Sequence, residues 1–85
     1  MEEFLGHDIV VDVVSHYVFL GRLKEVRADW IVLKQVDVHD LRDSKTTREL
    51  YVLDSHTDGI RMNRKRVLLP VSQIVSVSLL DDVIE

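Results

Sequence analysis

The sequence predicts a mainly β fold, in which five short antiparallel strands form a small barrel that carries one charged insertion. Three observations support this prediction. Both ends of the chain hold runs of Val, Ile and Leu, short turns separate these runs, and one run contains a mid-strand glycine. Because the chain has 85 residues, we expect a single domain over 1–85, with barrel strands at about 8–38 and 66–80.

The first part of the chain favours a meander of three strands joined by short turns. Residues 8–14 (DIVVDVV) come first, and residues 17–26 (YVFLGRLKEV) follow. Gly21, in the middle of the second run, indicates a sharp bend or a close backbone approach. Residues 30–38 (WIVLKQVDV) complete the meander. One face of the first strand is expected to hold Ile9, Val11 and Val13.

The end of the chain predicts a fourth and a fifth strand. Residues 66–70 (RVLLP) end at Pro70, which has no N–H to donate to a sheet. Residues 71–73 then form a tight turn, and residues 74–80 (IVSVSLL) alternate between apolar and polar positions. The apolar face of this last strand is expected to hold Val75, Val77 and Leu79.

The insertion, at about 39–65, has a different character. Thr46 precedes Glu49 by three residues, which is the spacing of a helix capping box, and Gly59 offers a stop signal. We therefore expect a short helix or an irregular excursion over 46–56, although its LYVL sequence also fits a strand.

Two stretches resemble a known family. FLGRLKEVRADWIVL resembles the bent second strand and the third strand of Sm-like barrels, and RVLLPVSQIVSVSLL resembles their last two strands and the turn between them. The same pattern is similar to the C-terminal barrel of ribosome maturation factors. The resemblance implies a five-stranded Sm-like barrel that is open at the edges of its fourth and fifth strands.

The resemblance also implies where RNA would bind. Sm-like proteins that bind uridine-rich RNA use an Asp and an Asn after the second strand and an Arg-Gly pair before the fifth. Here Asp29 can take the Asp position, but no Asn follows it, and PVSQ holds no Arg-Gly pair. Arg61 with Asn63 is the nearest comparable pair, and it precedes the fourth strand. The barrel pattern is therefore present without the usual RNA motifs.

Charge concentrates in two segments of a chain whose net charge is −4. The first, DVHDLRDSKTTRE (37–49), supplies a candidate charged interface that consists of Asp37, His39, Asp40, Asp43 and Arg48. The second, RMNRKR (61–66), supplies candidate contacts to a partner or to RNA, namely Arg61, Asn63, Arg64, Lys65 and Arg66. The acids of the first segment can pair with the arginines of the second, within one subunit or across two.

Other chemistry receives less support. The acids and His39 of the first segment could ligate a divalent metal, but they fit a solvated strand end and an Asp-rich turn better. Ser55 with His56, and Ser44 with His39, supply hydrolase residue types without a Gly-rich elbow. We therefore expect no catalytic residue, metal or cofactor. Trp30 can stack on a base, anchor an interface or fill the barrel rim.

Two functional hypotheses remain open. The first is a non-enzymatic interaction module that self-assembles through its barrel edges, as a homo-oligomer for which a ring is one form, and offers 37–66 to a protein partner. The second is an RNA-binding Sm-like protein that uses 61–66. The chain has no cysteine, and no apolar run approaches the roughly 18 residues of a membrane span, so we expect a cytoplasmic location and no membrane partner.

Overall fold

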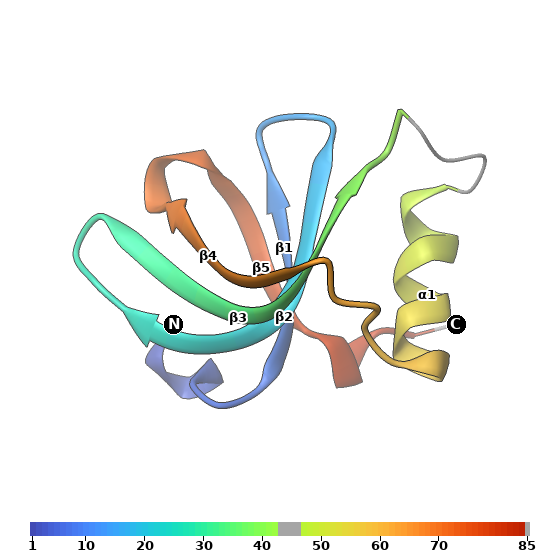
Figure 1. Cartoon of the computed structure of the whole chain (residues 1–85), viewed down its shortest axis with the longest axis horizontal. Helices are drawn as coiled ribbons and strands as arrows, with labels where there is room; N and C mark the ends of the chain where they lie inside the picture. Colours follow the sequence, from blue (N-terminus) through green and yellow to red (C-terminus); the bar gives the residue numbers. More distant parts are fainter. Residues whose placement is uncertain (43–46, 85) are drawn as a thin grey trace.

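A single five-stranded antiparallel sheet forms the body of the protein in the computed structural model, which describes residues 1–42 and 47–84 (Figure 1). The strands are β1 (Asp8–Val13), β2 (Tyr17–Val26), β3 (Trp30–Asp40), β4 (Arg64–Pro70) and β5 (Ile74–Leu79). One helix, α1 (Arg48–Asp58), separates β3 from β4. Short 3-10 turns are η1 (Glu2–Phe4), η2 (Val71–Gln73) and η3 (Leu80–Asp82). The predicted fold class is confirmed, and the insertion does contain a helix.

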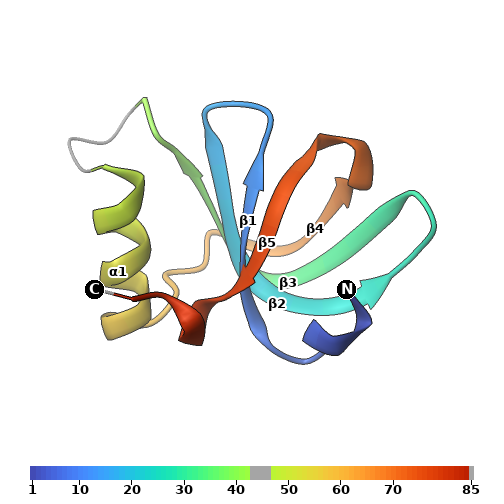
Figure 2. The same cartoon turned by 180° about the vertical axis from the view of Figure 1, so that it is seen from behind.

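The strand order is β4-β3-β2-β1-β5, so β4 and β5 stand at the two ends of the sheet. Each of these end strands pairs on one side only, β4 with β3 and β5 with β1. The sheet curves strongly without closing, as the views from front and back show (Figures 1 and 2). The protein therefore presents two unpaired strand edges.

Gly21 lies where β2 and β3 bend together. A Cβ atom at this position would stand 3.0 Å from Cγ2 of Val36 and 3.2 Å from the carbonyl oxygen of Lys34. The register shifts at the same place, and Gln35 opposite it adopts a φ of 53°. Such a bulge increases twist and bends the sheet. The predicted close approach at Gly21 is confirmed.

The two faces of the sheet bury different side chains. The main core fills the concave side and holds Ile9, Val11, Val13, Leu23, Ile31, Leu33, Val36 and Leu69. The opposite side, which we call the outer face, carries a smaller cluster of Val10, Val18 and Leu20 beneath Val52 of α1 and Leu80 of η3. The chain thus folds as one curved sheet whose outer face is covered in part by the insertion.

Both boundaries of the insertion and the placement of one side chain differ from the prediction. β4 begins at Arg64, and β3 extends to Asp40, so the insertion is shorter than expected. The predicted placement of Val75 is wrong: its side chain is 66% exposed. A register shift pairs Val13 of β1 with Ile74, which replaces Val75 against the main core. Val77 and Leu79 do pack there as predicted.

The N-cap of the helix lies one residue later than predicted. Thr47 is the N-cap, and its hydroxyl accepts a hydrogen bond from the Leu50 N–H at 3.2 Å. The predicted capping box falls on Thr46, which lies outside the described residues. Gly59 ends the helix as predicted, with a φ of 89° and its N–H donated to the Ser55 carbonyl. Over the same described ranges, no helix is long and apolar enough to cross a membrane.

Candidate functional site

A buried carboxylate connects the insertion to the sheet. Asp37, in β3, is only 9% exposed. Its Oδ2 atom accepts a hydrogen bond from the Tyr51 hydroxyl of α1, and its Oδ1 accepts one from Nδ2 of Asn63 at 3.0 Å. A buried carboxylate needs such donors because burial otherwise disfavours its charge. Asp37 therefore anchors both the helix and the segment that precedes β4.

Asn63 extends the sheet with its side chain. The Val38 N–H donates to Oδ1 of Asn63 at 3.0 Å, and Nδ2 of Asn63 donates to the Val38 carbonyl at 3.1 Å. Together with its bond to Asp37, these contacts use both amide hydrogens and the amide oxygen. The structure thus engages Asn63 in internal bonds and leaves no amide hydrogen for the contact to a partner or to RNA that the sequence suggested.

Tyr51 and His39 form a stacked pair against the sheet. Their ring centroids lie 3.8 Å apart, with 10° between the ring planes. Burial, and then the hydrogen bond to Asp37, raise the pKa of the Tyr51 hydroxyl well above its usual value. Nε2 of His39 is buried and has no hydrogen-bond partner among the residues described. Asp37 and His39 lie on the same face of β3, since both contact Tyr51.

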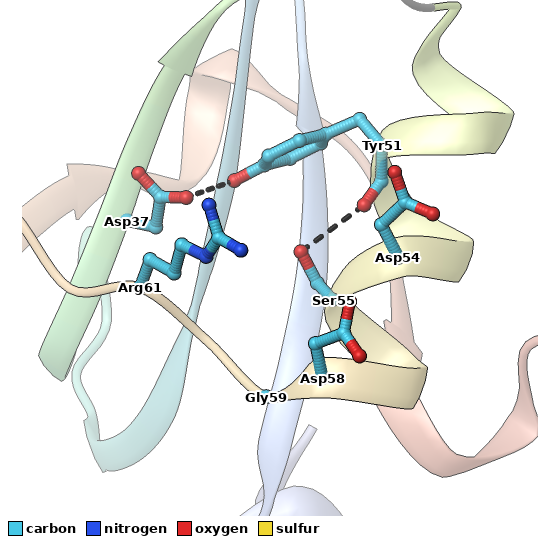
Figure 3. Close-up of a pocket in the computed structure, with 7 residues that line it drawn as sticks. All are labelled: Asp37, Tyr51, Asp54, Ser55, Asp58, Gly59 and Arg61. Carbon is cyan, nitrogen blue, oxygen red and sulfur yellow. Dashed lines mark hydrogen bonds between the residues drawn. The ribbon is translucent and has the colours of Figure 1, made fainter.

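A small pocket opens beside this network, with a volume of about 150 Å³ (Figure 3). Its walls are formed by Asp37, Tyr51, Asp54, Ser55, Asp58, Gly59 and Arg61. Arg61 is the only cation in this lining, and Figure 3 shows its guanidinium directed toward the Tyr51 hydroxyl. Within residues 1–42 and 47–84, no three His, Asp or Glu side chains gather closely enough to hold a metal ion.

The acids of the first charged segment find local partners. Asp40 pairs with Arg42 at 2.9 Å, and the hydrogen bonds from the Arg42 side chain and backbone lower the pKa of Asp40 to about 2. Arg48 lies 3.3 Å from Asp12 of β1. Asp43 falls outside the described residues. Within the described part of the chain, no ion pair joins this segment to the arginines of 61–66.

The second charged segment divides between a loop and a strand. Arg61 and Asn63 precede β4, whereas Arg64, Lys65 and Arg66 form its first three residues and are exposed. Arg64 also donates to the Asn63 carbonyl at 2.9 Å.

Sequence reasoning missed Tyr51 as a polar anchor, and it missed Arg22 and Lys34, which lie in register with Arg66. Strand alternation alone could have suggested that Lys34 faces outward.

Comparison with known proteins decides the fold. No protein-family model matches the sequence, and no curated protein matches it. A solved structure of a Pyrococcus abyssii Sm protein in complex with a uridine heptamer is similar, with a TM-score of 0.60 and 15% identity over 92% of this chain and 89% of that chain. This chain has the Sm-like fold. A chain from the crystal structure of the NatC complex bound to CoA is also similar, with a TM-score of 0.62, 16% identity and coverages of 92% and 80%.

In this Sm-like chain, the turns after β2 and after β4 meet. The Val71 N–H donates to the Asp29 carbonyl at 2.9 Å. Trp30, which begins β3, is 42% exposed beside them. A hollow of about 530 Å³ lies at the place where the two turns meet. It is lined by Ala28, Asp29, Trp30, Pro70, Val71 and Ser72. Asp29 and Trp30 thus lie together, but the lining contains neither an Asn nor an Arg.

Proposed function

We propose that this Sm-like chain is a non-enzymatic interaction module that assembles with copies of itself, β4 of one copy pairing with β5 of the next. The observation that carries the proposal is the open sheet, in which β4 and β5 each pair on one side only. An unpaired edge presents N–H and C=O groups that another strand can satisfy. The polar groups around Asp37 support a non-enzymatic reading, because Tyr51 and Asn63 both donate hydrogen bonds to its carboxylate.

Apolar exposure near both edges supports edge pairing. Leu68 of β4 is 41% exposed and Val75 of β5 is 66% exposed, although each sits within a strand. A domain of 85 residues buries a limited core, so the added apolar contact would stabilise the folded state.

Charge complementarity supports the antiparallel direction. In an antiparallel pair, the first residues of β4 lie opposite the last residues of β5. β4 begins with Arg64 and Lys65, whereas Asp81 and Asp82 directly follow β5, and all four are exposed. Because the β4 edge and the β5 edge are different surfaces, each copy can bind one neighbour at each edge. The assembly then either closes into a ring or extends as a chain of copies.

A charge exchange tests this arrangement. We expect Arg64→Glu/Lys65→Glu and Asp81→Lys/Asp82→Lys each to shift the protein toward monomer in native mass spectrometry and light scattering. Combining all four changes restores attraction and is expected to restore the oligomer. Lys24→Glu/Arg27→Glu is the matched control, because it makes the same change of charge at the end of β2, which is not an edge strand.

Two results would contradict the proposal. A wild-type protein that remains monomeric at tens of micromolar would remove edge pairing altogether. An oligomer that loses nothing when either pair of charges is reversed would place the interface elsewhere on the molecule.

RNA binding is a second candidate function. It is favoured by the fold shared with the Sm protein solved with a uridine heptamer, and by the exposed cations Arg64, Lys65 and Arg66. Binding through several cations should weaken steeply as salt rises. If replacing Arg64 and Arg66 by Glu leaves RNA affinity unchanged, the basic segment is not the binding site.

A further inference from the structure

A row of cations crosses the outer face of the sheet. The register places Arg22 of β2 opposite Lys34 of β3, and Lys34 opposite Arg66 of β4. Directly opposed residues in an antiparallel pair point to the same side, so these three side chains share one face. We call Arg22, Lys34 and Arg66 the cation row. Only the pairing of distant strands brings them together.

Lys34 and Arg66 lack the anions that such a row would normally require. Like charges directly opposite one another destabilise a sheet. Asp8, opposite Arg22, forms an ion pair with it at 3.2 Å. Among the described residues, neither Lys34 nor Arg66 forms an ion pair. The two neighbouring cations can therefore bind an anion from outside the chain.

The other charged groups near the row leave it cationic. Two other acids on this face are held by residues of α1, because Arg48 pairs with Asp12 and Tyr51 donates to Asp37. Glu25 of β2 pairs with Arg27 at 2.9 Å. The hydrogen bond from Arg27, with weaker attraction from Lys24 and Arg66, lowers the pKa of Glu25. Glu25 is thus shared among several cations and cannot neutralise Arg66 by itself.

An exposed aromatic ring lies on the same face. Trp30 pairs in register with Pro70, and Val32 with Leu68, so both pairs point outward with Lys34 and Arg66. α1 covers the other part of this face, over Val10, Val18 and Leu20, and leaves the part with Trp30 open. Trp30 stands four residues from Lys34, or roughly 13 Å along the strand. Cations and an exposed aromatic ring on one surface are the combination with which proteins bind single-stranded nucleic acids.

We propose that the outer face of β2, β3 and β4 binds a single strand of RNA, whose phosphates contact Lys34 and Arg66 and one of whose bases stacks on Trp30. This inference rests on the second candidate function above and assigns its site to this face, to which the 61–66 segment contributes only Arg66. Edge pairing between copies leaves this face accessible, because strands join at their edges.

The test measures the anisotropy of a labelled oligouridylate of about 10 nucleotides across a salt series. We expect Lys34→Gln/Arg66→Gln to weaken binding about tenfold and to reduce the salt slope by about 0.7 for each lost phosphate contact. Trp30→Ala should weaken binding about tenfold through lost stacking. Lys24→Gln/Arg61→Gln, an equal change of charge outside the cation row and outside the β4 edge, should change affinity less than about twofold.

A thermal melt separates binding from folding. Because Lys34→Gln/Arg66→Gln removes like-charge repulsion, its Tm should equal or exceed that of the wild type. If Lys34→Gln/Arg66→Gln binds oligouridylate as tightly as the wild type, the assigned face is wrong, although the protein still binds RNA. A wild type that binds no oligouridylate would end the RNA function and this inference together. If poly-glutamate competes equally and Trp30→Ala has no effect, the face binds acidic polypeptide, and the inference is wrong.

Discussion

Asp37 organises the polar interior at the residue scale. It receives hydrogen bonds from Tyr51, fourteen positions later, and from Asn63, twenty-six positions later. Asp37 and Asn63 were recognisable in the sequence as candidate interface and contact residues, but their pairing was not. Sequence reasoning expected arginines to meet these acids. The structure uses neutral donors instead, which satisfy a buried carboxylate without burying a second charge.

Removing one donor tests this network. We expect Tyr51→Phe to lower the free energy of unfolding by about 1–3 kcal/mol, because a hydrogen bond to a buried carboxylate is lost. Urea denaturation at fixed protein concentration measures the change. Tyr17→Phe is the control, since the Tyr17 hydroxyl has no hydrogen-bond partner among the described residues. Equal effects of the two substitutions would show that the Tyr51 hydroxyl is no anchor.

The same tyrosine predicts how stability depends on alkaline pH. Burial and the bond to Asp37 raise the pKa of Tyr51 in the folded protein, whereas an unfolded tyrosine ionises near about pH 10. The stabilisation is therefore complete below about pH 10 and is lost as pH rises above it. Denaturation between about pH 9 and pH 11 should show a steeper fall for the wild type than for Tyr51→Phe. Parallel curves would contradict the raised pKa.

At the scale of elements, the bend in β2 and β3 depends on Gly21. Strand positions and this bend were predictable, because period-two alternation and a mid-strand glycine are local signals. The bulge at Gln35 and the register shift that displaces Val75 were not, because they arise from pairing with another strand. For the same reason, the alignment of Lys34 with Arg66 appears only in the folded sheet.

Filling the space at the bend should destabilise the fold. We expect Gly21→Ala to cost about 1–3 kcal/mol, because the new methyl group meets Val36 and the backbone of Lys34. Val36→Ala removes the nearest of these contacts. In a double-mutant cycle measured by urea denaturation, the two changes together should cost at least about 0.5 kcal/mol less than the sum of the single changes. Simple additivity would argue against the contact.

The whole molecule presents two unpaired strand edges, at β4 and at β5. Because edge pairing adds interactions to the folded state only, the Tm of the wild type should rise with protein concentration. A series of thermal melts over about two decades of concentration measures this dependence. Arg64→Glu/Lys65→Glu should flatten it, and Lys24→Glu/Arg27→Glu should not. A Tm that is independent of concentration in the wild type would contradict self-assembly.

The sequence by itself determined the five strands, the bend at Gly21 and the place of the insertion, because periodicity and glycine signals act over a few positions. It left the insertion open between a helix, an irregular excursion and a strand. The tertiary structure decided which polar groups meet. It joined Asp37 to Tyr51 and Asn63, and it aligned Lys34 with Arg66 on one face. Such contacts depend on strand register and on where the helix lies, and both are set by long-range packing that no local pattern records.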